Sequence, residues 1–503
     1  MRPARILQTV AALLSLLCLC TAVSSTRCLR AETPPESPFE EALAQAEVPP
    51  PPADPDVLSR LQQAESQLQQ LQSERDDDRS LRMAFQDRMS QVRDPSITTV
   101  DEQTYSADRS RASKPWYERL SIRGYAQFRY NGTVFEDAGS APAQHVGDRS
   151  VGEDQNFLIR RARVIISGDV SDHMYVYLQP DFASSTPGSP DANQFAQIRD
   201  WYGDLYIDED KVYRVRIGQS KVPYGWENLQ SSSNRLPLDR SDPLNSAVRN
   251  ERDLGLFFYW TPKDAQDLFK EVLDQGLKGS GNYGVFGLGV YNGQGGSFTE
   301  QNDNLHVVTR LAYPFRLDGG QIVELGLQGY TGKYTVLSSP IEPLGVGPAA
   351  RPLGTLETGN QAGIRDARLG GTFVWYPQPF GFQAEWNVGN GPGLNDEQTA
   401  VVERALYGGY AMVMYRHELR TGGTLFPFAR YNLFRGGYKA ERNSPFSDIE
   451  EWEFGLEWQF NPQMELVTQY TITDRTNTTA LSTGRSYDSF DGHLIRTQFQ
   501  INY

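Results

Sequence analysis

The chain has 503 residues, more than one ordinary soluble domain needs, and its 45 glycines, 25 tyrosines and 24 phenylalanines favour a structure rich in strands and turns. The formal net charge of -15 argues against a protein that binds nucleic acid. Mean hydropathy is -0.53, and beyond residues 1–31 the sequence has no run of about 18 apolar residues, which excludes a membrane-spanning helix but not membrane-spanning strands.

The first segment, residues 1–31, has the features of a secretory signal peptide in their usual order. Arg2 and Arg5 provide the basic start, an apolar stretch runs over 6–23, and small residues follow where a peptidase would cut. An uncleaved anchor helix is the alternative. Two of the three cysteines precede the small residues where a peptidase would cut, so at most Cys28 remains in the mature chain and we expect no internal disulfide.

Residues 32–116 predict a stem of three parts. Prolines dominate a linker over 32–55, a helix follows over 56–93, and a second linker runs over 94–116. Apolar residues spaced four and three apart predict a coiled coil about 55 Å long. Its seam consists of Val57, Leu61, Ala64, Leu68 and Leu71. We expect this helix to associate between copies of the chain; the alternative is a solvated polar helix without a partner.

From residue 117 to residue 503, apolar residues alternate with polar ones, which is the period of β-strands. The last strand shows this clearly: one face holds Ile495, Thr497, Phe499, Ile501 and Tyr503, and the other holds Arg496, Gln498, Gln500 and Asn502. An apolar face with a charged reverse face suits a sheet with lipid outside and water inside. A terminal strand that ends on an aromatic residue resembles the tail of outer-membrane barrels, which implies recognition by the assembly machinery.

The pattern gives about sixteen strands, an even number as in bacterial outer-membrane barrels. They are expected near 120–130, 156–170, 173–182, 195–207, 211–222, 253–261, 282–292, 303–315, 321–334, 363–376, 379–389, 402–416, 424–435, 449–460, 463–475 and 491–503. Long connections alternate with short ones, as external loops alternate with periplasmic turns. The segment 262–281 falls where a short turn is due but has the pattern of a small helix, which we interpret as a periplasmic insertion. We therefore predict an all-β fold: a transmembrane antiparallel β-barrel of about 16 strands over 117–503, preceded by the short coiled-coil helix.

The segment 211–256 carries most of a family resemblance. It holds the runs IGQSKVPYG, ENLQSSS and DRS, and then Arg-Asp-Leu-Gly at the entry to the next strand. These runs resemble the phosphate-selective porin O and P family of outer-membrane proteins. So do IRRARV at 159–164, VYNG at 290–293, TRLAYPF at 309–315 and FARYN at 428–432. The resemblance implies that the polar part of 211–256 is the third loop, which folds into the barrel and narrows it.

The same resemblance implies an outer-membrane porin that passes small hydrophilic solutes by passive diffusion and prefers anions such as phosphate. We expect a homotrimer in contact with outer-membrane lipid, with its N-terminal stem in the periplasm. One alternative is a structural protein whose coiled coil over 56–93 contacts the cell wall and tethers the membrane to it; another is a non-selective general diffusion porin. None of the five histidines forms an H-E-x-x-H pair, and there is no G-x-S-x-G or phosphate-binding loop, so we expect no catalytic residue, no metal and no cofactor.

Inward-facing cations are the expected pore-lining, anion-binding residues, because a file of positive charges lowers the electrostatic cost of an anion passing through water-filled space. They are Arg123, Arg129, Arg160, Arg161, Arg163, Arg214, Arg216, Lys221, Arg235 and Arg240. Arg160 has the opposite parity to Arg161, so we expect it at a rim or a bulge. The resemblance implies a ladder of arginines and a few lysines along the pore. The arginines of IRRARV and Lys221 match these residues best.

Carboxylates also fall on the inward parity, and the opposing set is Asp200, Asp204, Glu385, Glu453 and Glu457. Pairing of the arginines with these carboxylates across strands is therefore an alternative that stays open beside anion binding. The early strands are basic inside and the late strands acidic, which predicts a field across the pore instead of a uniformly positive tube. A wide, mildly anion-preferring pore fits these residues as well.

Overall fold

The computed structural model describes residues 115–137, 143–146, 150–152, 157–183, 196–342, 351–420, 422–480 and 484–503. The chain divides into two compact units, Met1–Arg88 and Met89–Tyr503, and the described residues all belong to the second. The predicted signal peptide, Pro-rich linker and coiled-coil helix, together with most of the second linker, lie outside the described residues.

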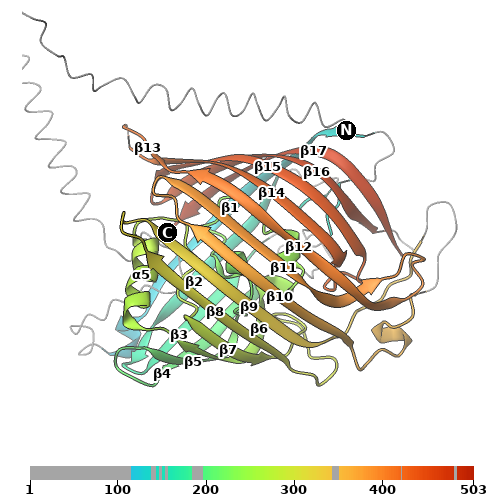
Figure 1. The fold of residues 1–503 in the computed structure, drawn as a ribbon, viewed down its shortest axis with the longest axis horizontal. Coiled ribbons are helices and arrows are strands. Elements are labelled where there is room, and N and C mark those ends of the chain that lie inside the picture. The colour runs from blue at the N-terminus through green and yellow to red at the C-terminus, as the bar shows by residue number, and fades with distance from the viewer. Residues whose placement is uncertain are drawn as a thin grey trace, which may run out of the picture. The chain divides into compact units, whose positions relative to one another are not determined.

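Antiparallel strands form one closed sheet (Figure 1). In chain order they are β1 (Ser121–Glu136), β2 (Phe157–Ser171), β3 (Met174–Asp181), β4 (Gln197–Tyr206), β5 (Tyr213–Lys221), β6 (Arg252–Trp260), β7 (Phe286–Tyr291), β8 (His306–Arg316), β9 (Ile322–Tyr334), β10 (Ile364–Trp375), β11 (Phe380–Leu394), β12 (Val401–Tyr415), β13 (His417–Glu418), β14 (Thr424–Gly437), β15 (Phe446–Asn461), β16 (Met464–Ala480) and β17 (Arg485–Asn502). Neighbours in the ring are neighbours in sequence, and β1 pairs with both β2 and β17, so the sheet closes on itself.

The barrel has sixteen strand positions, as the sequence predicts. The two-residue β13 continues β12, because both pair with β14. Each expected strand has its counterpart, and α5 (Lys263–Asp274) is the helix expected within 262–281. The shorter helical pieces are η2 (Trp116–Arg119), α3 (Trp226–Leu229), α4 (Asp242–Asn245), η3 (Arg249–Glu251) and η4 (Leu356–Thr358). Across the part of the chain that the structure describes, no helix combines the length and the apolar character that a membrane crossing requires.

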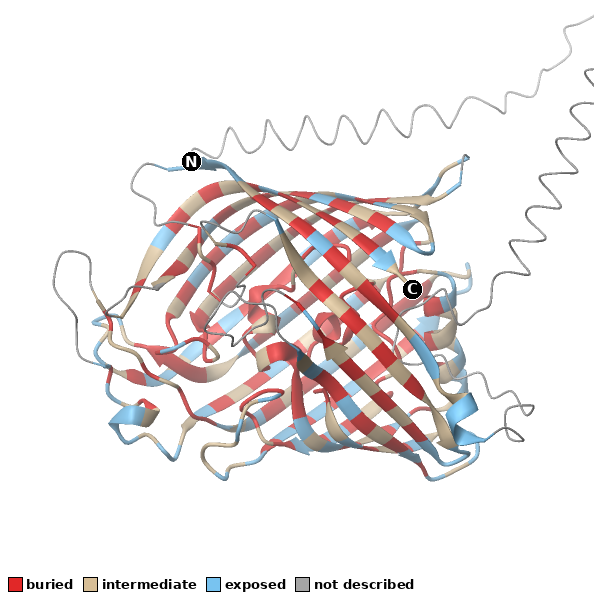
Figure 2. Cartoon of the chain, turned by 180° about the vertical axis from the view of Figure 1, so that it is seen from behind, coloured by how far each residue is buried: buried red, intermediate tan, exposed pale blue. Residues whose placement is uncertain are grey.

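Buried and exposed residues alternate along the strands and form bands in Figure 2. On β1, Ile122 and Phe128 are exposed, whereas Gln127 and Arg129 are buried. The exposed face is thus apolar and the buried face polar, which is the reverse of a water-soluble protein. This arrangement suits a barrel with lipid outside and a polar interior.

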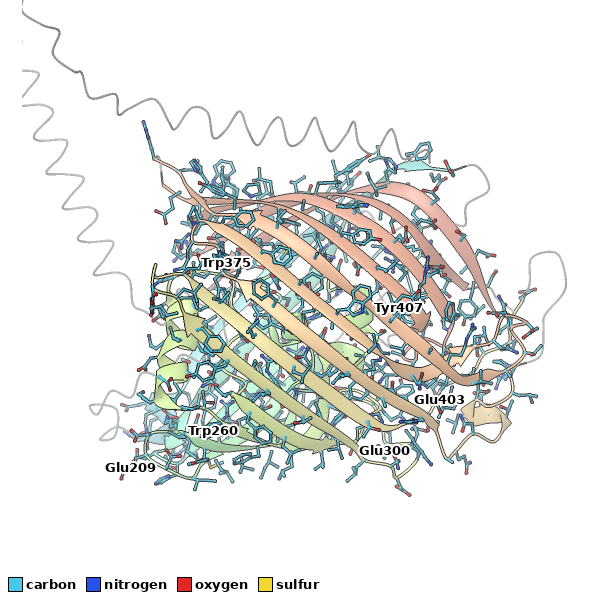
Figure 3. The ribbon with its side chains drawn as sticks, in the orientation of Figure 1. Glu209, Trp260, Glu300, Trp375, Glu403 and Tyr407 are labelled. Carbon is cyan, nitrogen blue, oxygen red and sulfur yellow. The ribbon has the colours of Figure 1, made fainter. Side chains whose placement is uncertain are left out.

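Aromatic side chains border the apolar outer surface, and acidic side chains lie beyond them. In Figure 3, Trp260 and Trp375 lie toward the barrel end that carries α5, and Tyr407 lies toward the other end. Glu209 lies at the first end and Glu300 at the second (Figure 3). Outer-membrane barrels have this order, an apolar band flanked by aromatic girdles at the two interfaces.

The last strands are longer than the sequence predicts. β16 reaches Ala480 and β17 begins at Arg485, so most of the expected 476–490 loop is a hairpin. Pairing continues between polar residues such as Asn477 and Asp488. The expected strands ended where the apolar alternation ends, but backbone hydrogen bonds between strands do not require an apolar face.

Candidate functional site

The connection between β5 and β6, residues 222–251, lies inside the barrel, and we call it the inward loop. Nearly all of its residues are buried, and its ribbon lies within the ring of strands (Figure 2). On one side Gln127 of β1 donates to the carbonyl of Ser232 at 3.0 Å, and on the opposite side the hydroxyl of Tyr330 of β9 donates to the carbonyl of Ala247 at 3.1 Å. The inward loop therefore crosses the interior, as the family resemblance implied.

Glu385 on β11 anchors the first helix of the inward loop. Its carboxylate accepts hydrogen bonds from the backbone N–H groups of Trp226 at 2.6 Å and Glu227 at 2.8 Å, which open α3. It also accepts from the hydroxyls of Thr372 at 2.9 Å and Tyr410 at 3.1 Å. The first N–H groups of a helix lack intrahelical partners, so a carboxylate there satisfies them. Glu385 faces inward as predicted, and it holds the loop.

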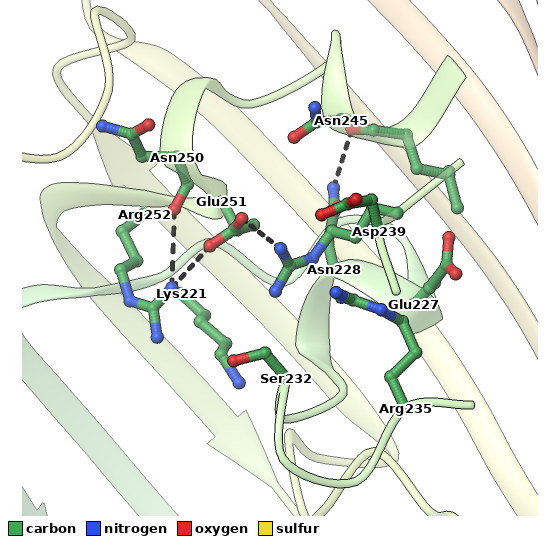
Figure 4. Close-up of polar contacts among 12 residues, drawn as sticks. Lys221, Glu227, Asn228, Ser232, Arg235, Asp239, Asn245, Asn250, Glu251 and Arg252 are labelled. Atoms are coloured by element: carbon green, nitrogen blue, oxygen red, sulfur yellow. Dashed lines mark hydrogen bonds and ion pairs between the residues drawn. The ribbon is translucent and has the colours of Figure 1, made fainter. Parts of the chain in front are cut away.

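Glu251, the last residue of the inward loop, lies among three guanidinium groups. Its carboxylate accepts from Arg252 at 2.5 Å (Figure 4) and from Arg199 at 3.0 Å, and it also pairs with Arg240. Burial alone would raise the pKa of Glu251, but the three arginines outweigh burial and hold this pKa well below its usual range. Asn250 and Glu251 have φ of 61° and 62°, a left-handed backbone that costs about 1–3 kcal/mol at each residue. We infer that the ion pairs stabilise this turn.

Asp239, in the middle of the inward loop, is surrounded in the same way. It pairs with Arg129 at 2.8 Å, with Arg160 at 3.3 Å and with Arg496. These arginines come from β1, β2 and β17, which are adjacent in the ring. Glu251 and Asp239 thus each pair with several arginines, most of which belong to the barrel wall. These ion pairs fix the course of the inward loop across the interior.

Two predicted arginines pair with carboxylates directly across the sheet. Arg216 faces Asp204 in the register of β4 and β5 and donates two hydrogen bonds of 2.8 and 3.0 Å to it. Arg163 faces Asp181 in the register of β2 and β3 at 2.7 Å. Both pairs are buried. Bidentate and charge-assisted bonds of this kind fix the side chains in place.

The carboxylates of the late strands are paired as well. Glu453 faces Arg430 across β14 and β15 and pairs with it, and Arg430 also binds Glu227 of the inward loop at 2.6 Å. Arg475 binds Glu451 at 3.3 Å. The expected division into a basic early wall and an acidic late wall is therefore wrong, because the late strands supply inward arginines of their own.

A β-bulge on β2 turns two neighbouring arginines toward the interior. Gln127 faces Arg161 and Phe128 faces Ile159, so Arg160 is the extra residue between them. Arg160 thus lies at a bulge, one of its two expected places. Arg161 donates to the side-chain oxygen of Gln127 at 2.7 Å, and none of the described residues provides it with a carboxylate partner.

These charged groups line one hollow, which we call the arginine cavity. Its empty volume is about 1080 Å³, open solvent included. Nine arginines line it, Arg160, Arg161, Arg163, Arg199, Arg240, Arg249, Arg430, Arg475 and Arg496, against seven carboxylates, Asp181, Asp239, Asp242, Glu251, Glu441, Glu451 and Glu453. His145 adds no charge, because burial, aided by Arg475, holds its pKa well below the usual value. Positive charge is therefore in excess along the lining.

The other predicted cations lie outside this lining. Arg214 and Lys221 each donate to a backbone carbonyl at 2.9 Å, and Arg235 donates to two carbonyls of the inward loop at 3.1 Å. Arg123 donates to the hydroxyl of Ser167 at 2.6 Å. Arg129 lies against Asp239, as described above. These cations hold backbone and side-chain oxygens in place.

Apart from Arg216 and Arg214, which pair with Asp204, the charged partners of the predicted carboxylates were outside the predicted set. Asp200 binds Arg252 at 2.8 Å, and Glu457 pairs with Lys278. Some of the omitted residues have inward strand parity, a signal that the sequence contains: Arg199, Arg430, Arg475 and Arg496. Others lie in connections that have no period, so strand parity does not mark them: Glu227, Asp239, Glu251 and Lys278.

Comparison with known proteins places the chain among porins. A family model described as phosphate-selective porin O and P matches residues 128–503. Among solved structures, Salmonella typhi OmpF in complex with daunomycin is similar at 12% identity and a TM-score of 0.46, over 76% of this chain and 97% of that one. OmpT, an outer membrane protein of Vibrio cholerae, has 10% identity and a TM-score of 0.45 over the same shares. The outer membrane channel DcaP of Acinetobacter baumannii has 10% identity and a TM-score of 0.42, again over 76% and 97%. No curated protein sequence matches the chain.

Proposed function

The chain belongs to the phosphate-selective porin O and P family, and on that premise we propose that it is an outer-membrane porin for passive diffusion of small hydrophilic solutes, with a preference for anions such as phosphate. The apolar outer face bordered by aromatic residues supports the membrane location. The polar interior, crossed by the inward loop, supports a narrowed aqueous path.

The observation that carries the anion preference is Arg161. It is buried on the inner wall and lines the arginine cavity, and it has no carboxylate partner among the described residues. Arg249 lines the same cavity without an ion pair to any described residue and stacks on Phe298 at 3.3 Å. Arginine presents a fork of donors that matches phosphate and carboxylate oxygens. The surrounding arginines are already engaged, so each contact to a passing anion stays weak enough for release.

Planar-bilayer recording with a salt gradient tests this function. The purified protein is expected to form channels whose reversal potential has the sign of anion preference, and added phosphate is expected to reduce the chloride current by competing for the same arginines. Absence of channels, or a reversal potential with the sign of cation preference, contradicts the proposal.

A non-selective general diffusion porin is the second candidate, and the pairing of most wall arginines favours it. Arg163, Arg216 and Arg430 each have a carboxylate partner, which cancels much of their field. The same recording separates the two functions. A reversal potential near zero, with no effect of phosphate on the chloride current, identifies the non-selective pore.

The proposal includes a homotrimer whose N-terminal stem lies in the periplasm. The family resemblance supports the trimer, and the spacing of apolar residues over 56–93 supports a coiled coil that joins the copies. Deletion of residues 32–115 tests the competing role of a tether to the cell wall. If the deleted protein still supports solute uptake while the envelope detaches, then tethering is the main task of the stem.

A further inference from the structure

Residues 276–284, which join α5 to β7, turn into the barrel, and we call this segment the strap. Its Leu277, Lys278 and Tyr283 are buried. Gly281 and Gly284 have φ of 93° and 81°, a backbone that residues with a side chain rarely adopt, and they allow the chain to reverse inside the barrel. The inward loop joins β5 to β6 and the strap joins β6 to β7, so the two segments enter the barrel from opposite ends.

The strap meets the inward loop inside the barrel. The Nε2 atom of Gln230 donates to the carbonyl of Lys278 at 2.6 Å, and the Nδ2 atom of Asn234 donates to the carbonyl of Gly279 at 2.9 Å. Leu277 belongs to the same buried apolar cluster as Trp226 of α3. The two segments therefore support each other inside the barrel.

Lys278 extends from the strap to the far wall of the barrel. Its ammonium pairs with Glu457 on β15 and lies 4.9 Å from the ring centre of Phe426 on β14. The strap starts between β6 and β7, and β15 lies on the other side of the ring. The side chains of Lys278 and Glu457 are 3% and 0% exposed. This ion pair therefore joins the strap to β15 across the interior of the barrel.

A second carboxylate lies beside this ion pair. Glu465 on β16 is buried and faces Gln459, so it is a diagonal neighbour of Glu457 on the inner wall. One oxygen of Glu457 is buried without a hydrogen-bond partner among the described residues. A single ammonium thus faces two carboxylates. Buried charges are costly unless they are compensated, and Lys278 supplies the compensating positive charge beside these carboxylates. It therefore lowers the electrostatic repulsion that a passing anion meets at this part of the wall.

We propose that the strap forms a second constriction in series with the arginine cavity and that Lys278 is its selectivity-determining residue. This inference deepens the proposed function and rests on it. The ammonium of Lys278 screens Glu457 and Glu465, so that an anion released from the arginine cavity meets little repulsion on its way out. Without Lys278, Glu457 lacks its ion-pair partner and presents uncompensated negative charge to the path, so the permeability of cations rises relative to that of anions.

The test is the full-length Lys278→Met variant in planar bilayers under a salt gradient. We expect the ratio of anion to cation permeability to fall by about twofold or more, because one buried charge is removed from a narrow section. Lys278→Arg keeps the charge and is expected to keep the wild-type ratio. Lys270→Met is the matched control, because Lys270 lies on the exposed face of α5, paired with Asp274, and its loss should leave the ratio unchanged.

The complementary variant changes the ratio in the opposite direction. Glu457→Gln removes the carboxylate that pairs with Lys278, so the anion-to-cation ratio should rise, and this variant keeps the inference testable if Lys278→Met does not fold. Heat-modifiable mobility on gels and a β-sheet circular dichroism spectrum establish folding. An unchanged ratio in either folded variant overturns the role of the strap. If the wild-type channel is anion-selective and the variants keep its permeability ratio, only this inference is contradicted. If the wild-type protein forms no channels, the proposed function itself is contradicted.

Discussion

Arg216 and Asp204 face each other across β4 and β5 and share two hydrogen bonds of 2.8 and 3.0 Å. Both side chains are fully buried, and the guanidinium lies 3.7 Å from the ring centre of Tyr202. A passing anion finds this guanidinium already occupied. Arg161, by contrast, faces the arginine cavity without a carboxylate. We infer that the paired arginines build the wall and that the few unpaired ones supply its positive field.

Breaking the pair of Arg216 and Asp204 should lower the free energy of unfolding but change the anion-to-cation permeability ratio little. Arg216→Met removes the two shorter bonds to the buried Asp204 and leaves Arg214 at 3.5 Å, and we expect the free energy of unfolding to fall by about 3–5 kcal/mol. Adding Asp204→Leu should restore most of the loss, because it removes the buried charge that lost its main partner. Denaturant unfolding in lipid vesicles measures both variants. A double variant as unstable as the single one contradicts this account.

Loss of the Glu385 carboxylate should raise the conductance of the pore by loosening the inward loop. Glu385→Ala removes the acceptor of two backbone N–H groups at the start of α3, which should destabilise the inward loop by about 1–3 kcal/mol. A looser loop narrows the interior less, so single-channel conductance and current noise should rise. Glu403→Ala, an exposed position on β12, serves as the control. Conductance equal to that of the wild type would show that Glu385 does not hold the loop.

Glu251 predicts that the inward loop keeps its anchor in mild acid. Three arginines hold its pKa below the ordinary 4.5, so the stability that it contributes is fully present above that value and is lost only as the pH falls below it. The contribution of Glu251 to the stability of the inward loop, read from channel conductance, should therefore be constant between about pH 7 and about pH 5. Glu251→Gln should already show higher anion preference at neutral pH. A wild-type transition within that interval that is absent from Glu251→Gln contradicts this prediction.

The outer face predicts a cost for charge in the lipid layer. Leu327 lies near the middle of β9 and is 54% exposed on the apolar side. Leu327→Arg should lower the free energy of unfolding in lipid vesicles by about 2–4 kcal/mol, the cost of arginine near the centre of a bilayer. Leu353→Arg, at an exposed position in the connection before β10, should change it little. Equal effects of the two substitutions would contradict a lipid-facing surface on β9.

The strands of the barrel wall could be predicted from the sequence, but the contacts of the segments inside the barrel could not. Strand positions and inward parity are local, because alternation over a few residues determines which face each side chain joins. The cross-strand pair of Arg163 and Asp181 follows from such parity once the register is known. The contacts of Glu385 with α3 do not follow, because they depend on the path of a loop whose polar residues have no period. Lys278 and Glu457 meet across the barrel for the same reason.

The predicted arginine set shows the same limit within one group of residues. Parity placed Arg161 and Arg216 on the inner wall alike, and both are there. Their environments differ because Asp204 lies opposite Arg216, whereas Gln127 lies opposite Arg161. The anion preference that we propose therefore depends on which partner the register brings to each arginine.

The most direct test of the central claim, that the unpaired arginines give the pore its anion preference, is the reversal potential of Arg161→Gln across a salt gradient. Arg365→Gln, an exposed position on β10, is the matched control. We expect the anion-to-cation permeability ratio of Arg161→Gln to fall by about twofold while the control keeps the wild-type ratio. A reversal potential of Arg161→Gln equal to that of the wild type, in a folded channel, contradicts the claim.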